Sequence, residues 1–213
     1  MLKLYDYAPS QNAYKVRLLL NHLGRDYETV PVSIFEGEGK TLAFLEKNPV
    51  GAVPVLELED GRTLPESNAI LLFLAEGTPY LPDDPWLCAQ VARWMFFEED
   101  HVQNGIASLR HWTMTGKLAR RSAEAIETKR AASIKSLAIL DEWLRSREFL
   151  VECGYTIADM SVYAYVGFAD EAGLDMQDYP NVVNWITRVQ AQPGFLKTMF
   201  PYSIDPASVN ELP

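Results

Sequence analysis

The stretch from Gly51 to Leu72 limits the possible folds more than any other part of the sequence. Residues 53–58 are rich in side chains that favour β-strands, and the dipeptide Asp60-Gly61 that follows is typical of a hairpin turn. A second short strand closes at Leu64, and an apolar run after it predicts a helix. The stretch therefore predicts a unit of strand, tight turn, strand and helix.

Two details of this unit point to ligand binding. Pro54 stands at the start of a strand, where its missing N–H leaves a gap in the hydrogen-bond ladder. Glu66 and Ser67 are expected in the first turn of the helix, where backbone N–H groups and the positive end of the dipole attract a carboxylate. Ser67 is suited to hold that anion and Glu66 to hold an ammonium group. Either motif alone is more typical of an ordinary helix cap or an ordinary X-Pro bond than of a ligand site.

Together these motifs resemble those of the glutathione transferase superfamily. Val53-Pro54 is similar to its cis-proline turn, and the segment from Glu66 to Ile70 is similar to its γ-glutamyl-binding motif. The resemblance extends over about residues 1–200. It implies a glutathione-binding domain followed by a helical domain.

Residues 1–76 are predicted to form a thioredoxin-like α/β domain with a mixed four-stranded sheet in the order βαβαββα. A strand over 2–7, a helix over 11–23 and a strand over 27–32 give the βαβ unit that a parallel pair requires. A short helix then stops before Pro49, since the residue before proline avoids the helical region. The loop over 33–40 is interpreted as a flexible rim.

Residues 77–85 are rich in proline and glycine and are predicted to form a linker. An all-α domain is expected over residues 86–200, and a loose tail over residues 201–213. The helices of that domain are predicted over residues 86–112, 118–147, 157–172 and 182–192. Thr156 and Asp159 fit a variant capping box, to which we assign a structural role.

Composition limits which cellular compartment and which classes of partner are expected. The 213 residues are 48% hydrophobic and carry a net charge of −10, which argues against nucleic acid or an anionic membrane as the main partner. Cys88 and Cys153 form no close-spaced pair, as in reduced intracellular proteins, so a cytoplasmic protein is expected. His22, His101 and His111 lack ligand spacing, so no metal is predicted.

The resemblance implies that the protein activates the thiol of glutathione, whose unperturbed pKa is about 8.5. Ser10 and Asn12, at the start of the first predicted helix, resemble the Ser-x-Asn pattern of bacterial members similar to the nu and theta-like classes. Both are predicted to be catalytic, by donating hydrogen bonds to the sulfur. A plain N-cap and a plain first-turn polar residue are the alternatives. Tyr7 and Tyr5 are rival hydroxyls, with Tyr7 ranked second.

Glutathione binding is assigned through the same resemblance to Lys40, Val53, Pro54, Glu66 and Ser67. The backbone of Val53 would bind the cysteinyl unit like one added strand, and Lys40 would bind the glycyl carboxylate. A solvated lysine is the alternative for Lys40.

Many relatives place a Lys or Arg directly before the Val-Pro pair, where this chain has Ala52. The acidic residues Glu98, Glu99 and Asp100 either reach a partner subunit or form a solvated charge run.

The sequence therefore predicts a homodimeric glutathione-dependent transferase that acts on an electrophile, a hydroperoxide or a disulfide. A disulfide-bond reductase that uses glutathione without a protein cysteine remains an alternative. So does a non-catalytic binding or regulatory module on the same fold. A cysteine-dependent thiol transferase is disfavoured because position 10 is serine, which forms no mixed disulfide.

Overall fold

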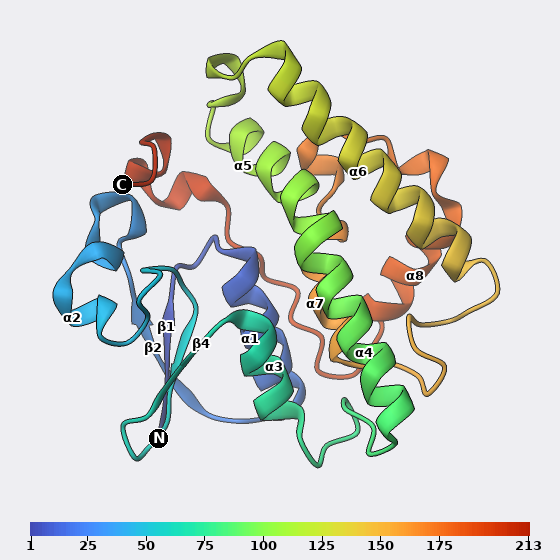
Figure 1. The fold of residues 1–213 in the computed structure, drawn as a ribbon, viewed down its shortest axis with the longest axis horizontal. Coiled ribbons are helices and arrows are strands. Elements are labelled where there is room, and N and C mark those ends of the chain that lie inside the picture. The colour runs from blue at the N-terminus through green and yellow to red at the C-terminus, as the bar shows by residue number, and fades with distance from the viewer. The chain divides into compact units, whose positions relative to one another are not determined.

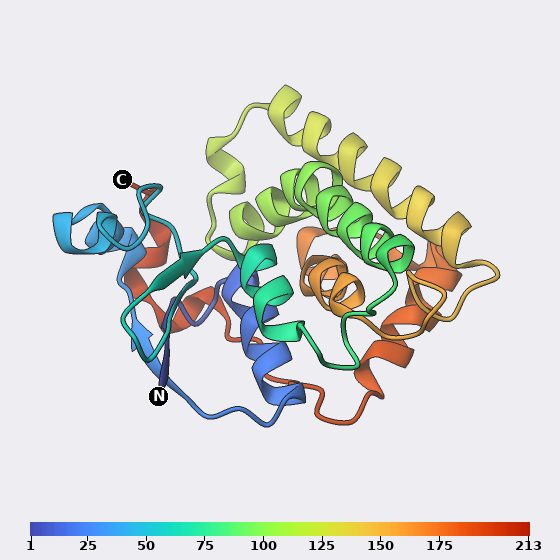
Figure 2. The same ribbon diagram turned by 60° about the horizontal axis from the view of Figure 1, so that its bottom comes forward.

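The computed structural model describes residues 1–213, and the chain divides into two compact units. Unit 1 comprises Met1–Leu74 together with Gly194–Pro213, and unit 2 comprises Ala75–Pro193. No helix is both long enough and apolar enough to cross a membrane. The ribbon of both units is shown in Figures 1 and 2.

A four-stranded mixed sheet forms the centre of unit 1, as predicted. Its strands are β1 (Leu2–Asp6), β2 (Tyr27–Pro31), β3 (Val55–Glu57) and β4 (Thr63–Pro65), in the spatial order β2-β1-β3-β4. β1 and β2 are parallel, whereas β3 is antiparallel to both β1 and β4. The parallel pair is joined by helix α1 (Gln11–His22), because parallel neighbours need a crossover connection.

Helices cover both faces of this sheet (Figure 1). α1 and α3 (Ser67–Ala75) lie on one side, and the short α2 (Leu42–Leu45) lies on the other. Leu4, Leu56 and Ile70 are fully buried in the unit. Phe44 and Val55 belong to a separate apolar cluster. The thioredoxin-like fold is therefore confirmed, and it places the start of α1 directly after the end of β1.

Unit 2 is all-α, as predicted. Its helices are α4 (Pro85–Phe97), the π-helical segment η3 (Glu98–Ala107), α5 (Ser108–Met114), α6 (Ala123–Leu144), α7 (Ile157–Val166) and α8 (Pro180–Gln190). α4, η3 and α5 follow one another without a break, over the range predicted as one long helix. Every residue of α7 is buried, which identifies α7 as the central helix of the unit.

The capping box at the start of α7 is confirmed. The Thr156 hydroxyl accepts from the backbone N–H of Ala158 at 3.3 Å, and Asp159 Oδ2 accepts from the backbone N–H of Thr156 at 3.0 Å. Asp159 Oδ1 accepts from the Leu150 N–H at 3.0 Å and from the Trp185 indole N–H at 2.9 Å. Complete burial outweighs these bonds and raises the pKa of Asp159 to about 6.

The structure differs from the sequence prediction in two segments of unit 1. The predicted rim over 33–40 consists of two short 3₁₀ turns, η1 (Ile34–Glu36) and η2 (Glu38–Lys40). The predicted loose tail is not loose, because residues 194–213 pack within unit 1 and contain the 3₁₀ turns η7 (Tyr202–Ile204) and η8 (Pro206–Val209). Proline and polar residues suggested disorder, whereas Ser208 in this segment is buried.

Candidate functional site

The first turn of α1 carries the predicted catalytic residues. Ser10 is the N-cap: its Oγ accepts from the Ala13 N–H at 3.2 Å, and its own N–H donates to the Tyr7 carbonyl at 2.7 Å. A serine hydroxyl has one proton to donate in addition to its acceptor sites, so capping leaves that proton available for a second acceptor. The first turn contains no acidic residue. Ser10 is therefore a cap, and the cap is chemically compatible with an anion at this helix end.

The start of α3 differs in detail from the prediction. The helix begins at Ser67, so Glu66 precedes the first turn instead of lying in it. The Glu66 carbonyl accepts the first helical bond, from the Ile70 N–H at 2.9 Å. Glu66 has a φ of 70°, in the left-handed region that glycine prefers. Backbone strain of this kind gathers at ligand sites, and here it falls on the residue predicted to bind an ammonium group.

A hydrogen bond joins the two helix starts. The Ser67 hydroxyl donates to Asn12 Oδ1 at 3.2 Å, and the Lys15 ammonium donates to Ser67 Oγ at 3.4 Å. Oδ1 of Asn12 is the acceptor in this bond, and the donor atom of the same side chain is its amide nitrogen. The structure thus brings together a predicted catalytic residue and a predicted binding residue.

Lys15 is a member of this site that the sequence analysis missed. Its side chain is fully buried. The signal was available in the sequence, because Lys15 interrupts an apolar helix and a lysine is almost never fully buried unless it has a partner. Its ammonium group places a positive charge beside Ser67, which favours a carboxylate at the start of α3.

The Val53–Pro54 peptide bond is cis, as the resemblance implied. The loop that leads to it is held by Asn48, which is 2% exposed. Asn48 Nδ2 donates to the Ala52 carbonyl at 2.7 Å, and Asn48 Oδ1 accepts from the Val50 N–H at 3.0 Å. The sequence predicted only that a helix stops before Pro49, whereas the two bonds of Asn48 fix the loop before Val53.

Lys40 lies beside that same loop. Its ammonium donates to the Val50 carbonyl at 3.1 Å, and its side chain is exposed. The neighbouring backbones touch at Gly39 and Gly51, where a Cβ on either residue would overlap the carbonyl oxygen of the other. The contact fixes η2 against the loop, so that Lys40 stays close to the approach to Val53.

Both rival tyrosine hydroxyls donate to carboxylates of the protein. The Tyr7 hydroxyl donates to Asp205 Oδ2 at 2.9 Å, and the Tyr5 hydroxyl donates to Glu57 Oε2 at 2.8 Å. Burial, and then the adjacent Asp205 carboxylate, raise the pKa of Tyr7 far above its usual range. These contacts favour Ser10 over either tyrosine as the hydroxyl that is available to a ligand.

Glu98, Glu99 and Asp100 do not behave as one unit, although they were expected either to reach a partner subunit together or to form a solvated charge run. Glu98 is fully buried and accepts from the Ser161 hydroxyl at 3.0 Å, so it neither reaches a partner nor lies in solvent. Glu99 and Asp100 are exposed, and Asp100 lies 3.4 Å from a ring nitrogen of His101.

Comparison with known proteins adds independent evidence. Residues 9–76 match the glutathione S-transferase N-terminal domain, and residues 80–193 match the glutathione S-transferase C-terminal domain. The chain belongs to the glutathione S-transferase family. The N-terminal match includes every residue predicted to bind or activate glutathione, from Ser10 to Ser67. The resemblance deduced from the motifs is therefore confirmed at the level of the family.

Individual members of the family agree with this assignment. Glutathione S-transferase F13 of Arabidopsis thaliana is 31% identical over 97% of this chain and 99% of its own length. A glutathione S-transferase structure from Pseudomonas fluorescens is 42% identical, with a TM-score of 0.89, over 92% of this chain and 97% of its own. Disulfide-bond oxidoreductase YfcG of Escherichia coli is 26% identical over 91% of this chain and 92% of its own length.

Proposed function

We propose that this transferase uses glutathione as its co-substrate and activates the glutathione thiol at the first turn of α1. The observation that carries the proposal is the 3.2 Å bond between Asn12 and Ser67. It joins the helix start suited to a thiolate with the helix start suited to a γ-glutamyl group. A single tripeptide can therefore engage both.

The roles follow from the chemistry of each group. Glu66 pairs with the γ-glutamyl ammonium, and the backbone N–H groups at the start of α3, beginning with that of Ser67, receive the adjacent carboxylate. The backbone of Val53 binds the cysteinyl unit in the manner of an added strand, and the cis peptide at Pro54 gives the loop its shape. Lys40 binds the glycyl carboxylate, exchanging its bond to the Val50 carbonyl for an ion pair.

Thiol activation requires the thiolate to be favoured over the thiol at neutral pH. The Ser10 hydroxyl and the Asn12 amide supply hydrogen-bond donors, and the α1 dipole supplies a positive field. No carboxylate in the first turn of α1 opposes them. These are the conditions that lower a thiol pKa and yield a nucleophile.

The thiolate then attacks an electrophile, a hydroperoxide or a disulfide. Disulfide reduction is a specific second candidate, since a relative with 26% identity is named a disulfide-bond oxidoreductase. With serine at position 10, a first glutathione would form the mixed disulfide and a second would resolve it. No metal takes part in this scheme.

We also propose that the protein is a cytoplasmic homodimer. Trp86 is 66% exposed and Phe96 is 70% exposed on α4, which leaves an apolar surface for a second copy. Cys88 and Cys153 are free thiols, as is typical of a reducing compartment.

Thermal unfolding with and without ligand tests glutathione binding. Glutathione and S-hexylglutathione, each at about 100 times its dissociation constant, should add about 2.7 kcal/mol to the free energy of unfolding. Ser67→Ala should weaken this stabilisation, while the exposed Ser203→Ala should leave it unchanged. An unchanged melting temperature at millimolar glutathione would contradict the proposal.

A kinetic panel then separates the reactions. Aryl halides, organic hydroperoxides and small disulfides are each assayed with glutathione. Turnover of disulfides alone would select the reductase. Binding without turnover of any class would select the non-catalytic module.

A further inference from the structure

The last twenty residues, 194–213, form what we call the C-terminal strap, which packs within unit 1. Its first anchor is on α1: the Gly194 carbonyl accepts from Asn21 Nδ2 at 2.8 Å, and the Leu196 carbonyl accepts from the Tyr14 hydroxyl at 2.6 Å. From there the strap runs toward η1, where the C-terminus lies in both views (Figures 1 and 2). The family matches end at residue 193, so the strap lies outside them.

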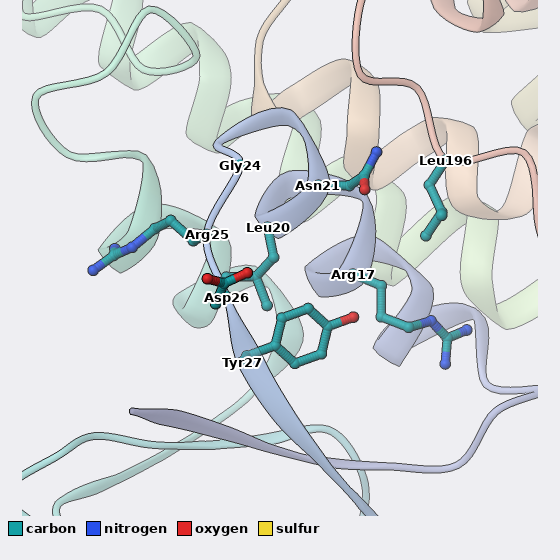
Figure 3. Close-up of a pocket in the computed structure, with 8 residues that line it drawn as sticks. All are labelled: Arg17, Leu20, Asn21, Gly24, Arg25, Asp26, Tyr27 and Leu196. Atoms are coloured by element: carbon teal, nitrogen blue, oxygen red, sulfur yellow. The ribbon is translucent and has the colours of Figure 1, made fainter.

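The second anchor is at Arg17, which lines a 310 Å³ cavity together with Asn21, Tyr27 and Leu196 (Figure 3). The Arg17 side chain is 6% exposed. It donates to Asp6 Oδ2 at 2.6 Å and to the Ala8 carbonyl at 2.8 Å, so it grips the end of β1 and the turn that follows. The Phe200 ring of the strap lies 5.8 Å from its guanidinium carbon, within cation–π range.

The third anchor is at Tyr7. Its hydroxyl donates to Asp205 Oδ2 at 2.9 Å, and Asp205 Oδ1 accepts from the Ala207 N–H at 2.9 Å, which holds η8. The Tyr7 ring packs edge-on against Phe35 of η1, with centroids 5.6 Å apart. The raised pKa of Tyr7 keeps its hydroxyl protonated, so it remains a donor to Asp205 across the neutral range.

The second and third anchors meet at one short turn. Tyr7 offers its carbonyl to the Ser10 N–H at 2.7 Å, and Ala8 offers its carbonyl to Arg17. Residues 7–10 thus connect β1 to the catalytic end of α1. The strap contacts Tyr7 of this turn through Asp205, and through Phe200 it contacts Arg17, which in turn holds the Ala8 carbonyl.

We propose that the C-terminal strap fixes the geometry of the Ser10 turn, with Asp205 and Phe200 as positioning residues for thiol activation. The inference rests on the proposed function of Ser10 as a thiol-activating group. Asp205 acts through Tyr7, and Phe200 acts through Arg17. A purely structural strap would stabilise unit 1 without altering the behaviour of the bound thiol.

Hydrogen exchange on the full-length protein tests whether the strap orders the Ser10 turn, and it does so without glutathione. In Asp205→Ala, the amides of residues 7–13 as well as those of the strap should exchange about tenfold faster than in the wild type. Asp205→Asn keeps one acceptor oxygen, for the Ala207 N–H, and offers the Tyr7 oxygen an N–H donor in place of the second acceptor, so it should restore part of the protection. The control is Ser203→Ala, an exposed strap residue, which should match the wild type. Faster exchange confined to the strap would overturn the proposal.

The second readout is kinetic. Asp205→Ala should lower kcat/KM for glutathione about 3- to 10-fold, which is less than the loss of a direct donor to the sulfur because Asp205 acts through Tyr7, and it should raise the bound thiol pKa slightly. Phe200→Ala should act in the same direction. If the thiol pKa and the kinetics are unchanged in both variants, the strap only stabilises unit 1 and the positioning role is wrong. If the wild type itself neither binds nor turns over glutathione, the proposed function fails, and the exchange experiment still decides whether the strap orders the turn.

Discussion

The starts of α1 and α7 use the same local device for different ends. Each helix begins with a hydroxyl residue, Ser10 or Thr156, whose oxygen accepts a backbone N–H of the first turn. In α7 the first turn also contains Asp159, whose fully buried carboxylate accepts from Thr156, Leu150 and Trp185. The first turn of α1 has no acid, and Ser10 is only partly buried.

The difference between the two helix starts shows how a structural N-terminus can be told from one that can bind an anion. A helix N-terminus favours a negative charge, and the sequence decides whether the protein supplies it. α7 carries its own anion and is a structural end. α1 leaves the position for a charge from outside, and a thiolate would meet that need.

The largest effect is expected on removing the internal anion of α7. Asp159→Ala leaves three buried N–H donors without acceptors and should lower the free energy of unfolding by about 3–5 kcal/mol. Ser122→Ala, at the exposed cap of α6, should cost only about 1 kcal/mol. Urea denaturation measures both. Equal losses would mean that the aspartate adds nothing beyond an ordinary cap.

The next effect is on the pH dependence of stability. Burial raises the pKa of Asp159 from 3.8 to about 6, so the folded state holds this proton more tightly than the unfolded state. Its stabilising contribution is complete below about pH 4 and is lost as the pH rises through about 6, by roughly 3 kcal/mol. Asp159→Asn has no such titration. When unfolding of both proteins is measured between pH 4 and 7, the free energy of unfolding should decline with pH in the wild type only. Parallel curves for the two proteins would contradict this prediction.

A smaller effect is expected from giving α1 an anion of its own. Asn12→Asp places a carboxylate in the first turn, as in α7, and removes an amide donor. We expect turnover to fall about 100-fold, against about 10-fold for Asn12→Ala, because repulsion of the thiolate adds to the lost hydrogen bond. Titration of the bound thiolate by its ultraviolet absorbance gives the corresponding pKa values. If Asn12→Asp turns over as fast as Asn12→Ala, a carboxylate in the first turn of α1 does not repel the thiolate, and the comparison with α7 fails.

The smallest effect is expected at Tyr7. Tyr7→Phe should raise the pKa of bound glutathione by less than about half a unit, since its hydroxyl serves Asp205. Ser10→Ala, which removes the proposed direct donor, should raise it by about one to two units and slow turnover 10- to 100-fold. The reverse order of these two variants would assign the chain to the tyrosine-type enzymes.

Much of the fold could be predicted from local patterns. The hairpin at Asp60-Gly61 and the capping box at Thr156 each depend on neighbouring residues, which sequence reasoning can see. The family resemblance supplied the cis bond before Pro54, since only a small share of X-Pro bonds is cis.

The rest depended on contacts between residues distant in sequence. Lys15 is buried against Ser67, fifty-two positions away, and Tyr7 meets Asp205, 198 positions away. No periodicity encodes such pairs. The composition of residues 201–213 predicted a loose tail because proline and polar residues are common in disordered segments, and residues 194–200 were assigned to the helical domain. The order of the strap comes from its acceptors that meet Asn21, Tyr14 and Tyr7.

The π-helical segment η3 sets the rotational phase of everything that follows it in the helix. Glu98, Val102, Ile106 and Arg110 recur every four residues, and all are buried. In a regular α-helix a four-residue repeat rotates off its own face, whereas the wider π turns keep it in step. Deleting one residue within η3 would turn Arg110 and the rest of α5 to a new direction. This helix should therefore tolerate substitutions on its exposed side far better than any change in its length.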